Sequence, residues 1–136
     1  MAKEEFMVSP QTPTQRELDI LKILWDRGEC TVREVYECIR EEAPIVQNTV
    51  QAMLRTMEEK GLVAHHTVGR AFVYRAAAKK ERTVKQMVGK LLDSAFDGSV
   101  DQLVQSLFSL RSPSPQELDQ LQTLIKSQKA KQRPKK

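Results

Sequence analysis

Residues 46–62 read VQNTVQAMLRTMEEKGL, and apolar residues recur in them at the spacing of an amphipathic helix. One side of such a helix carries Val46, Val50, Met53, Leu54 and Met57. The other side carries Gln47, Asn48, Gln51, Ala52 and Arg55. A solvated helix face ordinarily includes acids, but none occurs here before Glu58 and Glu59. The pattern therefore predicts a helix, ended by Gly61, whose polar face is suited to a hydrogen-bonding partner.

Two helices are predicted upstream, and each opens with a capping box. Thr14 and Glu17 have the required spacing, and Thr31 and Glu34 repeat it. The second helix is short, because Pro44 follows soon after it. Both helices carry apolar residues at helical spacing, so a helix pair precedes the polar helix.

A β-hairpin is predicted directly downstream, in LVAHHTVGRAFVYR (residues 62–75). Apolar residues alternate partly at period two on both sides of Val68, Gly69 and Arg70, as in two strands joined by a tight turn. Helix, helix, helix and hairpin is the order of a winged helix-turn-helix, in which the third helix enters the DNA major groove. The predicted fold class is mainly α with a small β-hairpin, comprising this domain and a C-terminal three-helix dimerisation region.

The C-terminal part predicts three further helices, starting near Val84, at Ser99 and at Ser114. Burying the seven apolar side chains of the first contributes roughly 10 to 20 kcal/mol. Ordering its backbone costs about as much, so the helix needs a partner. A three-helix arm exchanged between two copies would provide one, and a tail folded back on its own head is the alternative. The expected dimerisation residues are Val84, Met87, Val88, Leu91, Leu92, Phe96, Leu103, Val104, Leu107, Phe108, Leu118 and Leu121.

The charge is distributed unevenly along the 136 residues. Residues 1–77 contain 10 Lys and Arg against 12 Asp and Glu, whereas residues 78–136 contain 12 against 6. The basic pI near 9.2 therefore does not by itself indicate a nucleic-acid-binding head. The expected segments are a flexible lead-in (1–13), the winged helix-turn-helix (14–77), a helical dimerisation domain (78–126) and a basic flexible tail (127–136).

Several functional classes are disfavoured by the sequence. No signal core or apolar run of about 20 residues is present, so we expect a cytoplasmic protein without membrane insertion. Cys30 and Cys38 lack metal-site spacing and are expected to be reduced thiols. His65 and His66 point to opposite faces of a strand, so no metal site is expected. No catalytic or phosphate-binding motif occurs, and we expect neither enzymatic activity nor a cofactor.

The polar helix face has the chemistry needed to read DNA bases. The amides of Gln47, Asn48 and Gln51 can accept from and donate to an adenine edge together. Ala52 offers a methyl to a thymine methyl, and Arg55 suits a guanine edge or a phosphate. Two further residues complete the predicted DNA-binding set. Thr49 could contact a phosphate beside the groove, and Arg70, at the hairpin tip, could contact the DNA backbone or the minor groove.

Four separated stretches carry a resemblance to a known family: TQRELDILKILWDRGECTVREVYECI, NTVQAMLRTMEEKGLV, GRAFVYR and LLDSAFDGSVDQLVQSLF. In this order, across residues 14–125, they resemble the penicillinase repressor family of bacterial regulators, which includes the methicillin-resistance and copper-responsive repressors. The resemblance implies a homodimer on a dyad operator that represses resistance or stress genes, such as β-lactamase-type genes. It places Gln47, Asn48, Gln51 and Ala52 at base-contacting positions, Thr49 at a phosphate and Arg70 in the wing.

The chain also departs from the family pattern. Members often carry Thr, Lys or Arg where Asn48 and Gln51 stand, so the operator sequence is not expected to transfer. The copper-responsive branch ends in CxC motifs that are absent from this tail. In the β-lactam branch, a membrane sensor metalloprotease is linked to cleavage at an Asn-Phe bond, which corresponds here to Ser106-Leu107. A winged-helix protein adaptor, favoured by the acidic head, and a small-ligand-responsive regulator remain alternatives.

Overall fold

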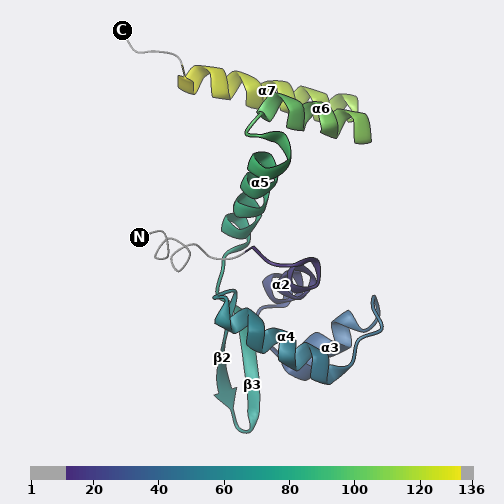
Figure 1. Ribbon diagram of the computed structural model, residues 1–136, viewed down its shortest axis with the longest axis vertical. Helices are drawn as coiled ribbons and strands as arrows, with labels where there is room; N and C mark the ends of the chain where they lie inside the picture. Colours follow the sequence, from purple (N-terminus) through teal and green to yellow (C-terminus); the bar gives the residue numbers. More distant parts are fainter. Residues whose placement is uncertain (1–11, 133–136) are drawn as a thin grey trace. The chain divides into compact units, whose positions relative to one another are not determined.

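The computed structural model describes residues 12–132 (Figure 1). Contacts divide the chain into two compact units, residues 1–89 and residues 90–136. The predicted lead-in lies outside the described residues up to residue 11, and Pro13 at its end is buried. The elements of the first unit are α2 (Gln15–Arg27), β1 (Cys30–Thr31), α3 (Val32–Ile39), α4 (Gln47–Glu59), β2 (Val63–Val68), β3 (Ala71–Ala76) and the first part of α5 (Lys80–Phe96).

Both predicted capping boxes are confirmed. The Glu17 amide donates to the Thr14 hydroxyl at 3.3 Å, and the Thr14 amide donates to the Glu17 carboxylate at 3.0 Å. The same pair of bonds joins Thr31 and Glu34 at 3.1 and 2.8 Å. Each box satisfies two backbone donors at a helix start, so α2 and α3 begin where the sequence indicates.

The predicted hairpin is also confirmed, with a third strand added to it. Val68 pairs with Ala71, so the loop is Gly69-Arg70. The positive φ of Gly69 (62°) at the first loop position is typical of a type II′ turn, which matches the twist of the strands. β1 pairs with β3 to give the antiparallel order β1-β3-β2. The sequence pattern did not predict β1, because two residues are too few to show alternation.

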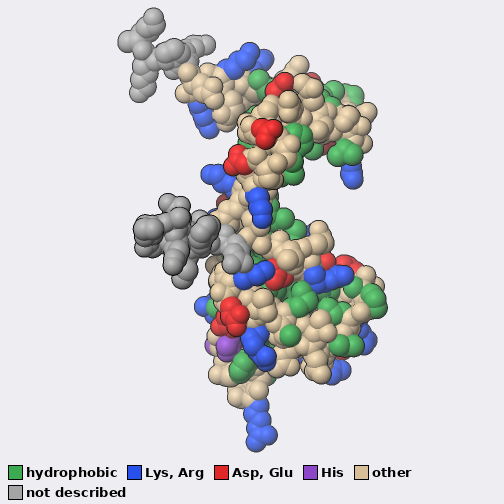
Figure 2. All heavy atoms as spheres, viewed as in Figure 1, with side chains coloured by type: hydrophobic (Ala, Val, Ile, Leu, Met, Phe, Trp, Pro, Cys, Tyr) green, Lys and Arg blue, Asp and Glu red, His purple; other side chains and the backbone are tan. Residues whose placement is uncertain are grey.

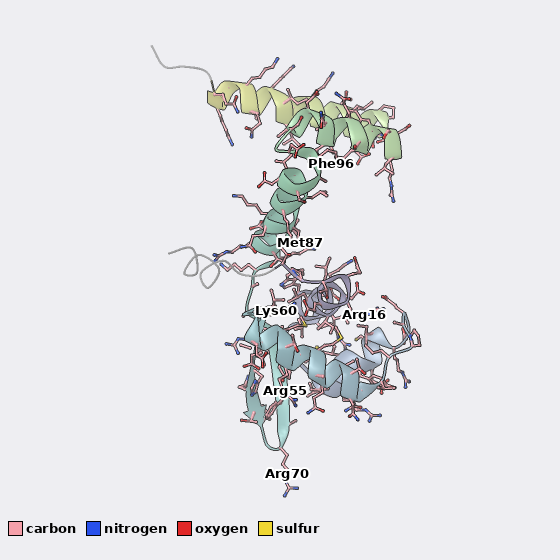
Figure 3. All side chains as sticks on the ribbon, in the orientation of Figure 1. Arg16, Arg55, Lys60, Arg70, Met87 and Phe96 are labelled. Atoms are coloured by element: carbon pink, nitrogen blue, oxygen red, sulfur yellow. The ribbon has the colours of Figure 1, made fainter. Side chains whose placement is uncertain are left out.

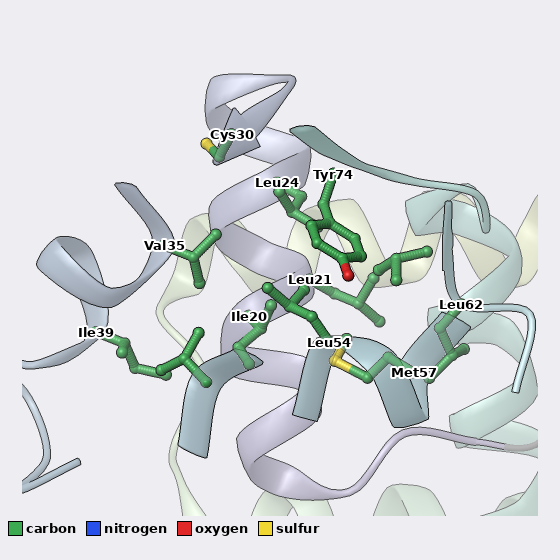
Figure 4. Packing of buried hydrophobic residues seen from close by; sticks show 12 residues of the cluster. Ile20, Leu21, Leu24, Cys30, Val35, Ile39, Leu54, Met57, Leu62 and Tyr74 are labelled. Atoms are coloured by element: carbon green, nitrogen blue, oxygen red, sulfur yellow. The ribbon is translucent and has the colours of Figure 1, made fainter. Parts of the chain in front are cut away.

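The apolar sides of α2, α3 and α4 meet the sheet in one core (Figure 4). Leu21 and Leu54 are fully buried at its centre, and Tyr74 reaches it from β3. Cys30 and Cys38 are free, and burial raises the pKa of the Cys30 thiol, which keeps it protonated. The core comprises Ile20, Leu21, Leu24, Cys30, Val35, Ile39, Val50, Leu54, Met57, Leu62, Val63 and Tyr74.

The first unit continues to Gly89, past the predicted domain boundary at residue 77. One hydrogen bond and one buried side chain tie the start of α5 to the head. The Trp25 indole donates to the Ala78 carbonyl at 2.9 Å, and Thr83 is only 2% exposed. The start of α5 is therefore part of the head.

The second unit contains the rest of α5, α6 (Val100–Leu110) and α7 (Pro115–Gln132). Its predicted helix starts are confirmed by two hydrogen bonds of 3.1 Å. In these, the backbone amides of Gln102 and Glu117 donate to the hydroxyls of Ser99 and Ser114. The tail predicted to be flexible from residue 127 is helical to Gln132, and residues 133–136 lie outside the described part. Lys, Gln and Ala favour helix, and the cations suit its C-terminal dipole. No helix within residues 12–132 is long and apolar enough to span a membrane.

Candidate nucleic-acid interface

α4 presents the predicted polar face to solvent. Val50, Leu54 and Met57 are completely buried on its inner side. Gln47 is half-buried, whereas the other polar-face side chains are exposed, namely Asn48, Thr49, Gln51, Ala52 and Arg55. The structure thus brings these six residues together on one helix, as the apolar periodicity of the helix requires.

Val46 does not lie on the inner side, where the sequence pattern placed it. It is the N-cap of α4, with an extended backbone (φ −106°, ψ 161°), and its side chain is 62% exposed. A helical periodicity applies only to residues with helical backbone, so the prediction for Val46 was wrong by one residue at the helix start.

The exposed residues form a line with two flanks. Asn48, Ala52 and Arg55 follow one another at i, i+4 and i+7 along α4. Gln51 lies on one flank of this line, and Thr49 lies on the other. Thr56, which is also exposed, follows Thr49 by seven residues and was not singled out from the sequence. The seven-residue spacing of two hydroxyls on one flank was the signal available for it.

Two charged groups at the C-terminal end of α4 are held by the protein itself. Glu58 contacts His65 Nδ1 at 2.7 Å, and Lys60 Nζ lies 2.8 and 2.9 Å from the two carboxylate oxygens of Glu17. Burial acts to raise the pKa of Glu17, but hydrogen bonds from Lys60 and Thr14 outweigh it and leave the pKa below its ordinary value. Lys60 is therefore engaged inside the head, and Arg55 is the cation that α4 offers to a partner.

The wing, formed by β2 and β3, has a defined position against α4. His65 stacks on Phe72 with ring centroids 4.2 Å apart, and Tyr74 lies 5.2 Å from the same imidazole. Together with the Glu58 contact, this stack joins the hairpin to the end of the helix. Arg70 is exposed at the tip and points away from the head (Figure 3). The hairpin therefore places the Arg70 guanidinium beyond the end of the sheet, away from the polar face of α4.

Basic side chains do not form one continuous patch on the face seen in Figure 2, where acidic side chains lie between them. Some exposed cations are paired locally. Arg16 lies 3.2 Å from Asp19, and Arg33 and Arg40 each lie 3.3 Å from Glu37. Within residues 12–132, no cluster of three or more His, Cys, Asp or Glu is placed to hold a metal ion. The exposed polar side of α4 is therefore the candidate site that the described head offers.

The predicted dimerisation residues are not buried in the single chain. Five of them are half-buried: Met87, Leu92, Phe96, Leu103 and Leu121. The other seven are exposed, from 37% at Val104 to 53% at Leu107: Val84, Val88, Leu91, Val104, Leu107, Phe108 and Leu118. No described residue after Thr83 is fully buried, so the C-terminal helices leave a large apolar surface uncovered.

A helix pair, a third helix whose polar face has no acid in its first three turns, and a hairpin with a basic tip define a winged-helix DNA-binding protein. The model of the penicillinase repressor family matches residues 13–127. The chain therefore belongs to this family of DNA-binding transcriptional repressors, which are not enzymes.

The chain is also similar to individual members. It is 23% identical over 113 residues to the penicillinase repressor of Bacillus licheniformis, covering 83% of this chain and 88% of that protein. The solution structure of the DNA-binding domain of the repressor BlaI is 30% identical, with a TM-score of 0.47, covering 52% of this chain and 85% of that one. The B. licheniformis BlaI monomer in complex with the blaP half-operator is 26% identical, with a TM-score of 0.48, covering 54% and 89%.

Proposed function

We propose that this protein is a homodimeric repressor that binds a dyad operator and blocks transcription of resistance or stress genes. The observation that carries the proposal is the exposed face of α4, which has no acid in its first three turns and is supported by a complete apolar core. Family membership favours DNA over a protein partner for this face. The BlaI monomer of B. licheniformis is bound to a half-operator, which fits a complex with one head on each half-site.

In the proposed complex, α4 lies in the major groove with its N-terminal turns deepest. Gln47, Asn48 and Gln51 contact base edges, and Ala52 meets a thymine methyl. Arg55 reaches a guanine or a phosphate further along the line. Thr49 and Thr56, on the same flank of α4, contact DNA phosphates. Arg70 contacts the DNA backbone or the minor groove beside the half-site.

Selection of bound duplexes from a randomised DNA library tests DNA reading directly. The full chain should enrich an inverted repeat whose half-sites are separated by about one helical turn or a multiple of it. The double variant Asn48→Ala/Gln51→Ala should lose the enrichment. A matched control, Gln15→Ala, removes an exposed amide from α2 and should keep it. Enrichment that is unchanged in the double variant would refute the assignment of α4 as the reading helix.

The dimer is supported by the uncovered apolar surface. Leu107 and Phe108, which are 53% and 45% exposed, lie on a helix that has no fully buried residue. A second copy would cover such a surface with the same residues, as a two-fold interface does. Leu107→Glu should shift the chain toward monomer in sedimentation equilibrium. Gln102→Glu adds the same charge to the exposed part of α6 and should leave the dimer intact.

Release from DNA is proposed to follow loss of the dimer. Two linked heads typically bind about 10² to 10⁴ times more tightly than one, so separating them removes most of the operator affinity. Cleavage at Ser106-Leu107 by a membrane sensor metalloprotease, the partner implied by the family resemblance, would have this effect. Both residues lie inside α6, so the helix must unwind locally before a protease can bind the bond.

A chain ending at Gln105 tests this mechanism without a protease. It should sediment as a monomer and bind a two-half-site operator about 10² to 10⁴ times more weakly than the full chain. Its circular dichroism should still show a folded head, because the head has its own core. A truncated chain that remains dimeric, or binds as tightly as the full chain, would mean that the signal acts on the head.

A further inference from the structure

The start of α4 differs from the other described helix starts whose caps are defined. Thr14, Thr31 and Ser99 each occupy the N-cap of a helix and accept a hydrogen bond from a backbone amide. Val46 occupies the same position in α4 and makes no side-chain cap bond. The recognition helix is thus the one among these four that begins with an aliphatic residue.

Val46 is a poor choice for helix stability. A hydroxyl at the N-cap satisfies a backbone amide, which an isopropyl group cannot do. Val46 does not compensate by packing, because 62% of it is exposed, whereas Val50 one turn later is fully buried. A residue that neither caps nor packs breaks a local rule of helix design, and such positions commonly serve function.

The position of Val46 suggests what its side chain contacts. It directly precedes Gln47 and Asn48, at the end of the helix that enters deepest into the major groove in proteins of this fold. The apolar group displayed on the floor of that groove is the C5 methyl of thymine, since the other base edges present donors and acceptors. An exposed isopropyl group beside two amides therefore complements a thymine next to hydrogen-bonded bases.

We propose that Val46 packs against a thymine methyl and so selects thymine at one position of each half-site. This inference rests on the proposed function, because it requires α4 in the major groove. Val46 adds an apolar reading element to the amides of α4. The contact also places Val46 in the interface, where burial of its side chain on binding offsets the poor helix start.

The test removes single methyl groups from the DNA. Each thymine of the selected operator is replaced in turn by deoxyuridine, which lacks only the C5 methyl, and the dissociation constant is measured for each duplex. For the unmodified protein, replacing the thymine next to Val46 should weaken binding about fourfold, the factor for one buried methyl group. A thymine next to Ala52 should be sensitive as well, but its effect should be the same in the Val46 variants. For Val46→Ser, replacing the thymine next to Val46 should have no effect, and for Val46→Ala the effect should be smaller than in the unmodified protein, because alanine keeps one methyl group.

Val68→Ser is the matched control, because Val68 is 59% exposed but lies on the wing. It should keep the deoxyuridine effect of the unmodified protein. Thermal unfolding gives a second readout: Val46→Ser supplies a capping hydroxyl, so its melting temperature should stay equal or rise while its affinity for the thymine operator falls.

Three results would overturn the inference. If the deoxyuridine effects are the same with and without Val46, the residue reads no methyl, and the proposed function stands as long as the operator is still preferred. If both Val46 variants lose affinity in proportion to lost stability, the role of Val46 is structural. If the unmodified protein prefers no sequence at all, the proposed function fails and this inference fails with it.

Discussion

Replacing Lys60 with methionine tests the ion pair that joins the start of α2 to the end of α4. Glu17 is 5% exposed, and Lys60 Nζ donates to both of its oxygens at 2.8 and 2.9 Å. Methionine keeps most of the apolar stem but leaves a buried carboxylate whose remaining partner is Thr14. Breaking a buried pair in this way costs about 3 to 5 kcal/mol. The Lys60 side chain is 20% exposed, so in the variant water can hydrate the Glu17 carboxylate in part. We therefore expect Lys60→Met to lower the free energy of unfolding by ~3 kcal/mol, the lower end of this range.

Urea unfolding at several pH values measures this loss. In the folded protein the pKa of Glu17 lies below its ordinary value of 4.5, so the pair stabilises the head above about that pH. This stability is lost as the pH falls through the lowered pKa, because the carboxylate is then protonated. The difference between the unmodified protein and Lys60→Met should therefore be largest at pH 7 and shrink as the pH falls through the lowered pKa of Glu17.

Glu17→Gln combined with Lys60→Met separates the buried charge from the lost contact. The amide is neutral, so the double variant should recover much of the stability that Lys60→Met loses at pH 7. Two results would refute the reasoning: a loss below about 1 kcal/mol for Lys60→Met, the range of an exposed pair, or a double variant no more stable than the single one.

Further predictions concern DNA binding. Gln51→Ala should weaken binding to the selected operator by ~1 to 3 kcal/mol in gel shifts, with little change on random DNA; equal losses on both would contradict base reading. Arg70→Ala should lower the slope of log affinity against log salt by about 0.9 per head, and an unchanged slope would mean that the wing tip touches no phosphate. Deleting residues 127–136, which carry several cations, should also reduce the slope while the selected sequence stays the same.

Features set by nearby residues could be predicted from the sequence. The partners in the capping boxes of Thr14 and Thr31 are three residues away, so the pattern contains the whole interaction. The hairpin turn depends on Gly69 and its neighbours, and the buried side of α4 follows from its own periodicity. The starts of α2 and α3, the turn and the orientation of the recognition helix therefore follow from local sequence.

Features set by distant residues could not be predicted. Glu17 was expected only in a capping box, but it also binds Lys60, 43 positions away. β1 exists because Cys30 and Thr31 meet β3, and no pattern within two residues indicates this pairing. Val46 is exposed because its backbone is extended, which a helical projection does not consider. In each case the missing information is tertiary geometry, and at Val46 it changes the set of candidate DNA contacts.

The charge of the head links its DNA chemistry to the proposed switch. Phosphate contacts ordinarily supply much of the affinity of a DNA-binding protein. Here residues 1–77 contain 10 Lys and Arg against 12 Asp and Glu, and four of these cations lie beside acids: Lys60 beside Glu17, Arg16 beside Asp19, and Arg33 and Arg40 beside Glu37. A single head must then rely on base contacts over a small area and should bind weakly. Tight repression would require two heads linked through the C-terminal helices, and separating them would release the DNA without any change in α4.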